Sequence, residues 1–346
     1  MYKGQPVIDV HGHMSTPPHF RAFAFNLIAL RSTAGGLDIS DQLMETALGR
    51  HLRIMDERNI DVQMISPRPV AMMQWEAAPL VDKWTRVTND VIYQQIKMHP
   101  DRYVGVAQLP QHELHDTNNC LEELERCVQE MNFVGALVNP DPGADRLTPG
   151  MDTDYWYPLY KKAEQLQVPL IVHPAITRDP RLERIPHSYQ YNNITEETLA
   201  TLLLEHSDVF ERFPGLTIII CHCGGSLSRF VKSAISSGEA AGGQVGTAAA
   251  ADTEMETLRP NNIYFDSCAY DKDFLTTAIK QRGVDRIVFG TEAPGSGTGV
   301  INPETGKPSD DLIPVIESMD FLTEDDKRKI LRDNALRLFP RLKTGR

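Results

Sequence analysis

Eight short apolar segments recur along the chain, and most of them are separated by segments with helical periodicity. They lie at residues 7–10, 62–65, 103–107, 133–138, 168–172, 216–221, 263–265 and 287–289. Strands this apolar, joined by crossover helices, form a parallel sheet that is buried on both faces. Eight such units in a chain of 346 residues predict an α/β fold, a (β/α)8 TIM barrel. The alternative is a doubly wound open sheet, which requires no particular number of strands.

Helical patterns fill most of the connections between these strands. The first covers about residues 41–55, begins at an N-cap that is either Ser40 or Asp41, and carries apolar residues at helical spacing. Further helices are predicted at about 82–98, 117–130, 155–166, 195–212, 311–319 and 324–336. The last two follow the eighth strand, so we expect a helical extension over residues 300–346.

The connection over residues 14–39 is longer than most connections in compact domains. It contains Pro17, Pro18 and a pair of glycines, together with an apolar patch that runs from Phe20 to Leu30. Connections of this length are usually functional or disordered, and the apolar patch leads us to predict a lid-like insertion that covers part of the site. Residues 1–346 are predicted to form a single barrel domain that includes this insertion.

Composition limits the class of function. The formal net charge of −12 argues against a nucleic-acid surface, but net charge does not set the sign inside a cleft. No run of about 18 apolar residues is present, so we expect no membrane span. The first strand begins close to Met1, so we expect no secretory signal. The five cysteines are odd in number and lack framework spacing, which is typical of reduced thiols in a cytoplasmic protein.

The first strand leads into the sequence His11-Gly12-His13. In extended backbone, residues two positions apart point to the same side, so both imidazoles can converge on one point. Gly12 lets the backbone pass close to whatever group occupies that point. Two imidazoles are half of a zinc-type ligand set. A surface His-X-His is the alternative, and partners elsewhere in the chain decide between the two.

Polar residues follow seven of the eight predicted strands, at the end where a barrel carries its catalytic residues. They are His11, His13, Arg68, Asn139, His173, His222, Asp266 and Glu292. Because the carboxyl ends of all barrel strands meet at one face, these side chains are expected to come together there. Four histidines and two acids around one rim predict a metal site.

Three residues near this rim have alternative interpretations. Arg68 either binds a substrate anion or forms a structural ion pair. Cys221 and Cys223 flank His222, and we interpret them as packing groups rather than thiolate ligands.

Motifs along the whole chain resemble those of the amidohydrolase superfamily. They are Asp9-Val10-His11-Gly12-His13, His173-Pro174, His222 before Gly224-Gly225, the acid after Val288-Phe289-Gly290, and Asn334-Ala335 with Leu336. More narrowly, the chain looks like the branch that contains aminocarboxymuconate semialdehyde decarboxylase and related nonoxidative decarboxylases. That branch usually has Asp after the eighth strand, where this chain has Glu292.

The departure at Glu292 makes the chain similar to the 4-oxalomesaconate hydratases of the same branch. That similarity also rests on Ser66-Pro67-Arg68, Asn139-Pro140-Asp141-Pro142 and Gly299-Val300-Ile301-Asn302-Pro303. These hydratases are zinc enzymes that add water to a carbon–carbon double bond in aromatic degradation. The resemblance implies zinc ligation by His11, His13, His173 and Glu292, with His222 as the nearby acid/base. The segment from His222 to Phe230 is shorter than the loop that the resemblance implies.

The predicted function is therefore hydration of an unsaturated di- or tricarboxylate such as 4-oxalomesaconate, by a zinc-dependent hydro-lyase. Zinc would lower the pKa of water towards about 7, so that it attacks an alkene carbon conjugated to a carbonyl. Arg68 is expected to bind a substrate carboxylate, and Asn139, Tyr189 and Asn192 other substrate oxygens. His222 would move a proton, and Glu292, one methylene longer than Asp, would act as a base as well as a ligand.

Other functions remain open at this stage. They are nonoxidative decarboxylation of an aromatic or muconate-type acid, metal-dependent hydrolysis of a cyclic ester or amide, and a noncatalytic metal-binding role. Another divalent metal such as Mn²⁺ is the alternative to Zn²⁺. The expected partners are a small anionic carboxylate substrate and other copies of the chain in a homo-oligomer, either a dimer or a tetramer; no nucleic acid or membrane is expected.

Overall fold

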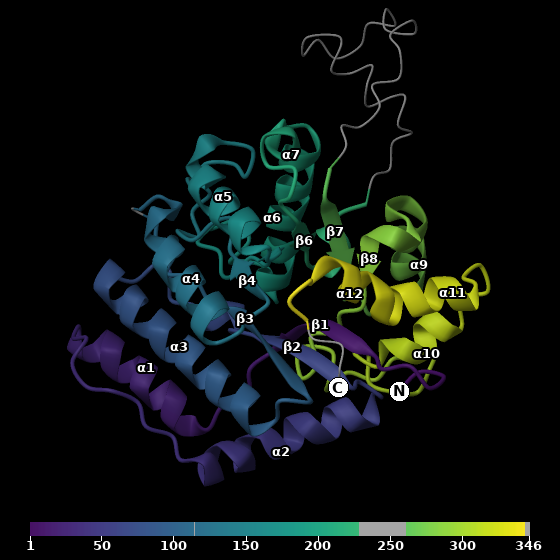
Figure 1. Ribbon diagram of the computed structural model, residues 1–346, viewed down its shortest axis with the longest axis horizontal. Coiled ribbons are helices and arrows are strands. Elements are labelled where there is room, and N and C mark those ends of the chain that lie inside the picture. Colours follow the sequence, from purple (N-terminus) through teal and green to yellow (C-terminus); the bar gives the residue numbers. More distant parts are fainter. Residues whose placement is uncertain (114, 228–260, 343–346) are drawn as a thin grey trace, which may run out of the picture.

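The computed structural model describes residues 1–113, 115–227 and 261–342, and its core is an eight-stranded parallel sheet (Figure 1). The strands are β1 (Ile8–His13), β2 (Val62–Ser66), β3 (Tyr103–Ala107), β4 (Gly135–Val138), β5 (Leu170–Val172), β6 (Ile218–Ile220), β7 (Ile263–Asp266) and β8 (Ile287–Val288). Each strand pairs with the next in the chain, without the reversal of order that a doubly wound sheet requires. The predicted (β/α)8 barrel is confirmed.

Backbone hydrogen bonds bring the last strand back to the first. The Val10 N–H donates to the carbonyl of Phe289 at 2.8 Å, and the Glu292 N–H donates to the carbonyl of His11 at 2.7 Å. The sheet is therefore nearly closed, and the segment after β8 lies against the histidines of β1.

Helices alternate with the strands and cover the outside of the barrel (Figure 1). The longer ones are α1 (Pro18–Leu30), α2 (Asp41–Glu57), α3 (Ala78–Met98), α4 (Leu121–Glu130), α5 (Tyr157–Leu166), α6 (Ser188–Glu205) and α9 (Lys272–Arg282). The shorter ones are α7 (Val209–Arg212), α10 (Leu312–Glu317), α11 (Glu324–Arg328) and α12 (Asn334–Leu338). Single turns and a π-helical segment also occur at η1 (Pro69–Ala71), η2 (Thr117–Cys120), η3 (Asp154–Trp156), η4 (His222–Gly224), η6 (Val284–Arg286) and η7 (Lys329–Asp333).

The helix boundaries follow local capping. Ser40 is the N-cap of α2, because its hydroxyl accepts a hydrogen bond from the Leu43 N–H at 3.4 Å. The helix expected over 195–212 is divided into α6 and α7, and the Val209 N–H at the start of α7 donates to the hydroxyl of Ser207 at 3.3 Å. Helix α9 was not predicted, although Asp271 caps it by accepting from the Phe274 N–H at 2.7 Å.

The connection over residues 14–39 contains helix α1, which the sequence analysis did not predict. Phe20, Phe23 and Leu27 are buried and spaced as on one face of a helix. The ring of Phe20 packs against Trp84 of α3, with 4.4 Å between the centroids. Helix α1 therefore lies beside α3 at the barrel rim (Figure 1), and its action as a lid stays a prediction.

The segment over residues 300–346 contains α10, α11, η7 and α12, and residues 343–346 lie outside the described part of the chain. It packs closely on β8. The Asn334 amide donates to the carbonyl of Ile287 at 2.7 Å, and the Phe289 N–H donates to the carbonyl of Ile330 at 3.0 Å. This segment thus supports the strand that leads to Glu292.

Both faces of the sheet are buried. Alternate residues of the strands belong to two separate apolar clusters, for example Val138 to one and Leu137 to the other. The larger cluster includes the buried faces of the outer helices, and the smaller one includes Leu338 and Phe339 near the C-terminus. This is why the strands appear in the sequence as continuous apolar runs. Within the described residues, the helices are too short or too polar to cross a membrane.

Gly12 is expected to be essential for packing between β1 and β2. A Cβ atom at Gly12 would lie 2.3 Å from Cδ of Gln63, whose amide group is held by Asp9 at 2.8 Å and by the carbonyl of Ala293 at 2.7 Å. Because Gln63 is fixed, we expect Gly12→Ala to lower the free energy of unfolding by about 1–3 kcal/mol, measured by urea denaturation.

Gly49 of α2 provides the matched control for this measurement. A Cβ atom at Gly49 would meet nothing within 4 Å, so Gly49→Ala should raise the free energy of unfolding by up to about 1 kcal/mol. Equal stability of the Gly12→Ala variant and the wild type would show that the contact with Gln63 relaxes without cost.

Candidate metal centre

Three histidines and one glutamate converge at the carboxyl ends of the strands. His11 and His13 lie on β1, His173 follows β5 directly, and Glu292 lies in the loop after β8. One donor atom from each residue lies within 4.8 Å of the corresponding atoms of the other three. The imidazole centroids are 5.1 Å apart for His11 and His13, and 5.1 Å apart for His11 and His173.

One nitrogen of each of these imidazoles has a hydrogen-bond partner, and the other has no hydrogen-bond partner in the described residues. Nδ1 of His11 lies 2.7 Å from Oδ2 of Asp266, Nδ1 of His13 lies 2.8 Å from Oγ of Ser66, and Nδ1 of His173 lies 2.7 Å from the carbonyl oxygen of Pro174. The Nε2 atoms of all three are buried without a hydrogen-bond partner in the described part of the chain.

These contacts and burial act differently on the three rings. For His11, burial lowers the pKa, but the Asp266 carboxylate outweighs it and raises that pKa. A carbonyl oxygen only accepts, so Nδ1 of His173 carries the proton and Nε2 presents a lone pair. Burial also lowers the pKa of His13 to about 4 and holds that of His173 well below the usual range, which keeps both neutral. Histidine metal ligands are usually neutral imidazoles whose second ring nitrogen, the one that does not bind the metal, forms a hydrogen bond with a neighbouring group. The donor set therefore fits a divalent metal ion.

Glu292 supplies the anionic donor. Its Oε1 lies 3.6 Å from Nε2 of His13, while Oε2 accepts from the hydroxyls of Tyr270 at 3.2 Å and Ser296 at 3.1 Å. Burial alone would raise the pKa of Glu292, but its contact with His13 and the charges of nearby histidines hold that pKa well below the usual range. The carboxylate is therefore ionised and oriented towards the imidazoles.

The backbone around Glu292 is unusual. Glu292 has a φ of +58°, in the left-handed region, and a Cβ atom at Gly295 would lie 2.1 Å from its carbonyl oxygen. Glycine at position 295 therefore allows the tight turn that aims the Glu292 side chain back at β1. Strained backbone of this kind is typical of functional sites.

A second pair, the half-buried His222 and the buried Glu197, lies beside these donors. His222 follows β6, and its ring centroid lies 5.0 Å from that of His173 and 5.3 Å from that of His11. Its Nδ1 lies 2.6 Å from Oε1 of Glu197, a buried residue of α6. Burial lowers the pKa of His222, but the adjacent Glu197 carboxylate outweighs it and raises that pKa to about 10. The Glu197 carboxylate thus favours the protonated form of His222, which lies beside His173 and His11.

Sequence reasoning missed Glu197 because it lies within a predicted helix rather than at the end of a strand. An acidic residue on the buried face of a helix was the available signal, since a buried charge needs a partner.

Two other groups of donor atoms in the described residues also include His11. One adds His222 and Cys268, and the other adds Cys221 and Asp266. Burial raises the pKa of both thiols well above the usual range, so they are protonated and poor ligands.

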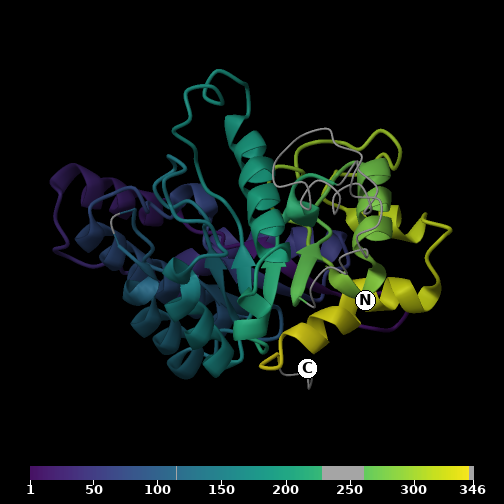
Figure 2. The same ribbon diagram turned by 90° about the horizontal axis from the view of Figure 1, so that it is seen from above.

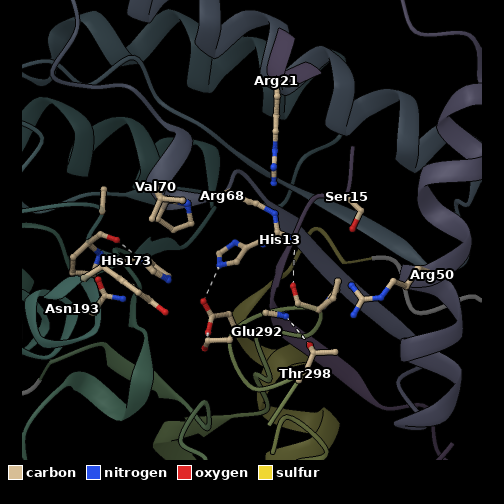
Figure 3. A pocket seen from close by; sticks show the side chains of 18 residues that line it. His13, Ser15, Arg21, Arg50, Arg68, Val70, His173, Asn193, Glu292 and Thr298 are labelled. Atoms are coloured by element: carbon tan, nitrogen blue, oxygen red, sulfur yellow. Dashed lines mark hydrogen bonds and ion pairs between the residues drawn. The ribbon is translucent and has the colours of Figure 1, made fainter. Parts of the chain in front are cut away.

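A cavity of about 550 Å³ opens next to the metal donors (Figure 3). Among the residues that line it are His13, His173, Glu292, Arg68, Tyr189 and Asn193. The predicted substrate residues Arg68 and Tyr189 therefore face the same space as the metal donors. In Figure 3 the side chains of Arg68 and His13 point towards the centre of this cavity. Figure 2 shows α6, in teal, standing above the strands with the loop before it.

Asn139 and Asn192 do not line this cavity, in contrast to the other two predicted substrate residues. The side-chain amide of Asn139 donates to Gln74 at 2.8 Å, and its side-chain oxygen accepts from the Asp141 N–H at 3.0 Å. Asn192 donates to the carbonyl of Ile176 at 3.3 Å. Their direct contact with substrate stays a prediction. The segment from His222 to Phe230 is described only as far as Leu227.

Comparison with known proteins identifies the family. The model of the amidohydrolase family matches residues 8–341. The chain belongs to the amidohydrolase family. The resemblance predicted from the motifs at His11, His173 and His222 is confirmed, and the members of the family it matches are enzymes.

Two hydratases are similar to the chain over nearly its whole length. It is 30% identical to the 2-keto-4-carboxy-3-hexenedioate hydratase of Sphingobium sp. (strain NBRC 103272 / SYK-6), with 97% of this chain and 96% of the relative covered. The crystal structure of a 4-oxalomesaconate hydratase from Rhodopseudomonas palustris superposes with a TM-score of 0.81 and 28% identity, covering 97% of this chain and 96% of that one.

A decarboxylase is also similar. The dihydroxybenzoic acid decarboxylase of Polaromonas sp. JS666, solved with bound manganese and an inhibitor, superposes with a TM-score of 0.67. The two are 25% identical, and the alignment covers 97% of each chain. The metal donors of this chain and the manganese of that neighbour together support a divalent metal, without identifying which one.

We expect protein purified without chelators to contain about one divalent metal ion per chain. His173→Ala removes one of four donors and should lower the metal content strongly, measured by elemental analysis. Removal of the metal from the wild type should lower Tm, because an ion that binds only the folded state stabilises it.

His19→Ala serves as the control, because His19 is exposed on α1 and lies outside the donor set. The same metal content in the His173→Ala and His19→Ala proteins would contradict the assigned donor set.

Proposed function

We propose that this enzyme is a zinc-dependent hydro-lyase that adds water to the double bond of an unsaturated di- or tricarboxylate such as 4-oxalomesaconate. The observation that carries the proposal is Glu292, a glutamate that lies among the metal donors and also holds hydrogen bonds from Tyr270 and Ser296. The similarity to two hydratases over nearly the whole chain supports it. The proposed ligands are His11, His13, His173 and Glu292.

The bound ion would supply Lewis-acid chemistry, which makes water a nucleophile near neutral pH. The protein residues then handle two protons. Glu292 takes one proton from the attacking water, whose oxygen bonds to the alkene carbon that is β to the activating carbonyl. The electron pair of the double bond moves towards that carbonyl. His222, held protonated by Glu197, delivers a proton to the α carbon and completes the addition.

Arg68 is the proposed anchor of a substrate carboxylate. Its Nη2 donates to the carbonyl of Pro294 at 3.3 Å, which fixes the guanidinium at the cavity wall and leaves other N–H groups for a ligand. Tyr189 is proposed to bind another substrate oxygen. Asn139 and Asn192 are proposed to contribute by holding the loops after β4 and β5, through their bonds to Gln74 and Ile176.

Further proposals concern the setting of the reaction. Zinc is preferred because three imidazoles and one carboxylate suit it, and manganese is the alternative that the neighbour from Polaromonas supports. A cytoplasmic location is supported by the five cysteines, which are all buried and free. We also propose a homo-oligomer, a dimer or a tetramer, with a small anionic carboxylate as the substrate.

Nonoxidative decarboxylation is the second candidate, supported by the decarboxylase neighbour. The test is to give the metal-loaded enzyme 4-oxalomesaconate and 2,6-dihydroxybenzoate in parallel. Loss of ultraviolet absorbance by the first substrate, without release of carbon dioxide, is the expected result. Release of carbon dioxide from the aromatic acid, with no consumption of the alkene, would make the hydratase proposal wrong.

We expect Glu292→Asp to retain metal but lose most of its hydration activity, because the shorter side chain withdraws the base from the water. Loss of one general base typically costs about 10²- to 10⁴-fold in rate. Glu292→Gln should be slower still, because an amide is a poor base. Measuring zinc content and kcat for each variant checks this, and near wild-type kcat in Glu292→Gln would exclude Glu292 as the base.

We expect Arg68→Lys to raise KM by about 10-fold or more. Lysine keeps the charge but lacks the planar fork that binds a carboxylate at two points. Steady-state kinetics with the hydration substrate measures the effect. An unchanged KM and kcat would instead give Arg68 a structural role at Pro294.

A further inference from the structure

Two neighbouring cavities share one wall. The first contains the metal donors, and the second, of about 600 Å³, lies beneath α1 and is lined largely by apolar side chains such as those of Phe20, Ile28 and Trp84. The residues that line both cavities are Ser15, Arg21, Arg50, Arg68, Val70 and Pro294. Three of these six shared residues are arginines.

The three arginines come from different elements and meet at one place. Arg21 lies on α1, Arg50 on α2 and Arg68 in the loop after β2. Figure 3 shows the side chains of Arg21 and Arg68 reaching towards each other, and Arg50 reaching into the cavity from the opposite wall to His173. The fold thus gathers three guanidinium groups beside the metal donors. Burial lowers the pKa of Arg68, and the charges of Arg21 and Arg50 lower it further.

Almost no negative charge balances this group. Glu292 is the one carboxylate among the described residues that line either cavity, and it belongs to the metal donors. No ion pair joins Arg21 or Arg50 to an acid in the described part of the chain. Both side chains are exposed, so they remain free to bind a ligand.

Other arginines of the same helices or their ends do pair with acids. Arg31, at the end of α1, lies 2.6 Å from Glu76, and Arg58, at the end of α2, lies 2.8 Å from Asp310. In a chain of net charge −12 such acidic partners are abundant, so unpaired arginines gathered at a cavity require another explanation. A guanidinium fits a carboxylate at two points, which makes an anionic ligand the natural counterpart.

We propose that Arg21 and Arg50 bind a second carboxylate of the substrate, so that the site selects acids with two or more carboxylates over monocarboxylates. The inference rests on the proposed function, in which Arg68 binds the first carboxylate and the double bond lies next to the metal donors. Helix α1 thereby becomes part of the specificity site, and its packing on α3 through Phe20 and Trp84 sets the position of Arg21.

Fumarate and crotonate provide a matched pair of probes. Both have a trans double bond with a carboxylate on one side. On the other side fumarate has a second carboxylate and crotonate has a methyl group. Isothermal titration calorimetry on the metal-loaded protein gives Kd for each. We expect the wild type to bind fumarate about 10-fold or more tightly than crotonate, and the difference to shrink at high salt because these arginines are exposed.

The variants are Arg21→Gln and Arg50→Gln, with Arg53→Gln as the control. Arg53 is exposed on α2, as Arg50 is, but lines neither cavity, so its replacement makes the same change in net charge away from the site. Each of the first two variants should weaken fumarate binding by about 10-fold and change crotonate binding by less than about 2-fold. Arg53→Gln should leave both unchanged, and circular dichroism should show the wild-type fold throughout.

Three results would overturn the inference. The first is that the wild type binds the two acids equally, or does not bind fumarate measurably. The second is that the Arg21→Gln and Arg50→Gln proteins lose affinity for both acids together, and the third is that Arg53→Gln weakens fumarate binding as much as those two variants do. The hydration assay is separate from these binding measurements. An enzyme that selects fumarate through Arg21 and Arg50 but never adds water to an alkene would retain this inference and lose the proposed function. An enzyme that hydrates the alkene but shows no such selection would retain the proposed function and lose this inference.

Discussion

The buried carboxylate of Asp9 joins the two ends of the sheet on which the site depends. It accepts hydrogen bonds from the Thr291 hydroxyl at 2.6 Å, the Thr291 N–H at 3.1 Å, the Gln63 amide at 2.8 Å and the His11 N–H at 3.0 Å. Strand β8 has only two residues, so few ladder hydrogen bonds are available at this seam. The hydrogen bonds of Asp9 compensate for the missing ladder bonds. They also connect the loop that carries Glu292 to the strand that carries His11 and His13.

A metal-binding geometry requires that each donor be held by something other than the metal. Asp266, Ser66 and the carbonyl of Pro174 hold the three imidazoles from β7, β2 and the loop after β5. Tyr270 and Ser296 hold the carboxylate of Glu292. Because these supports come from several strands, the donors converge only once the barrel has closed.

Some features of the fold and of the site leave a clear pattern in the sequence, and others do not. The strands and the rim residues were predictable, because burial on both faces gives apolar runs and seven of the eight runs lead to a polar rim residue. Glu197 was not, because its partner His222 lies 25 positions away and only the fold brings them together. The amides of Asn139 and Asn192 illustrate the opposite case. Asn139 follows β4 as predicted and Asn192 lies on α6, yet both amides form hydrogen bonds, with Gln74 and Ile176, and neither residue lines the cavity.

The charge of the chain and the charge of its site are set independently. A net charge of −12 repels anions at long range, yet such repulsion is screened beyond about 8 Å at physiological salt. Within that distance the local groups dominate, and the cavity is lined by the guanidinium groups of Arg21, Arg50 and Arg68 beside donors that fit a divalent cation. In the proposed reaction, these cationic groups would stabilise a developing enolate where it forms, whatever the net charge of the whole chain.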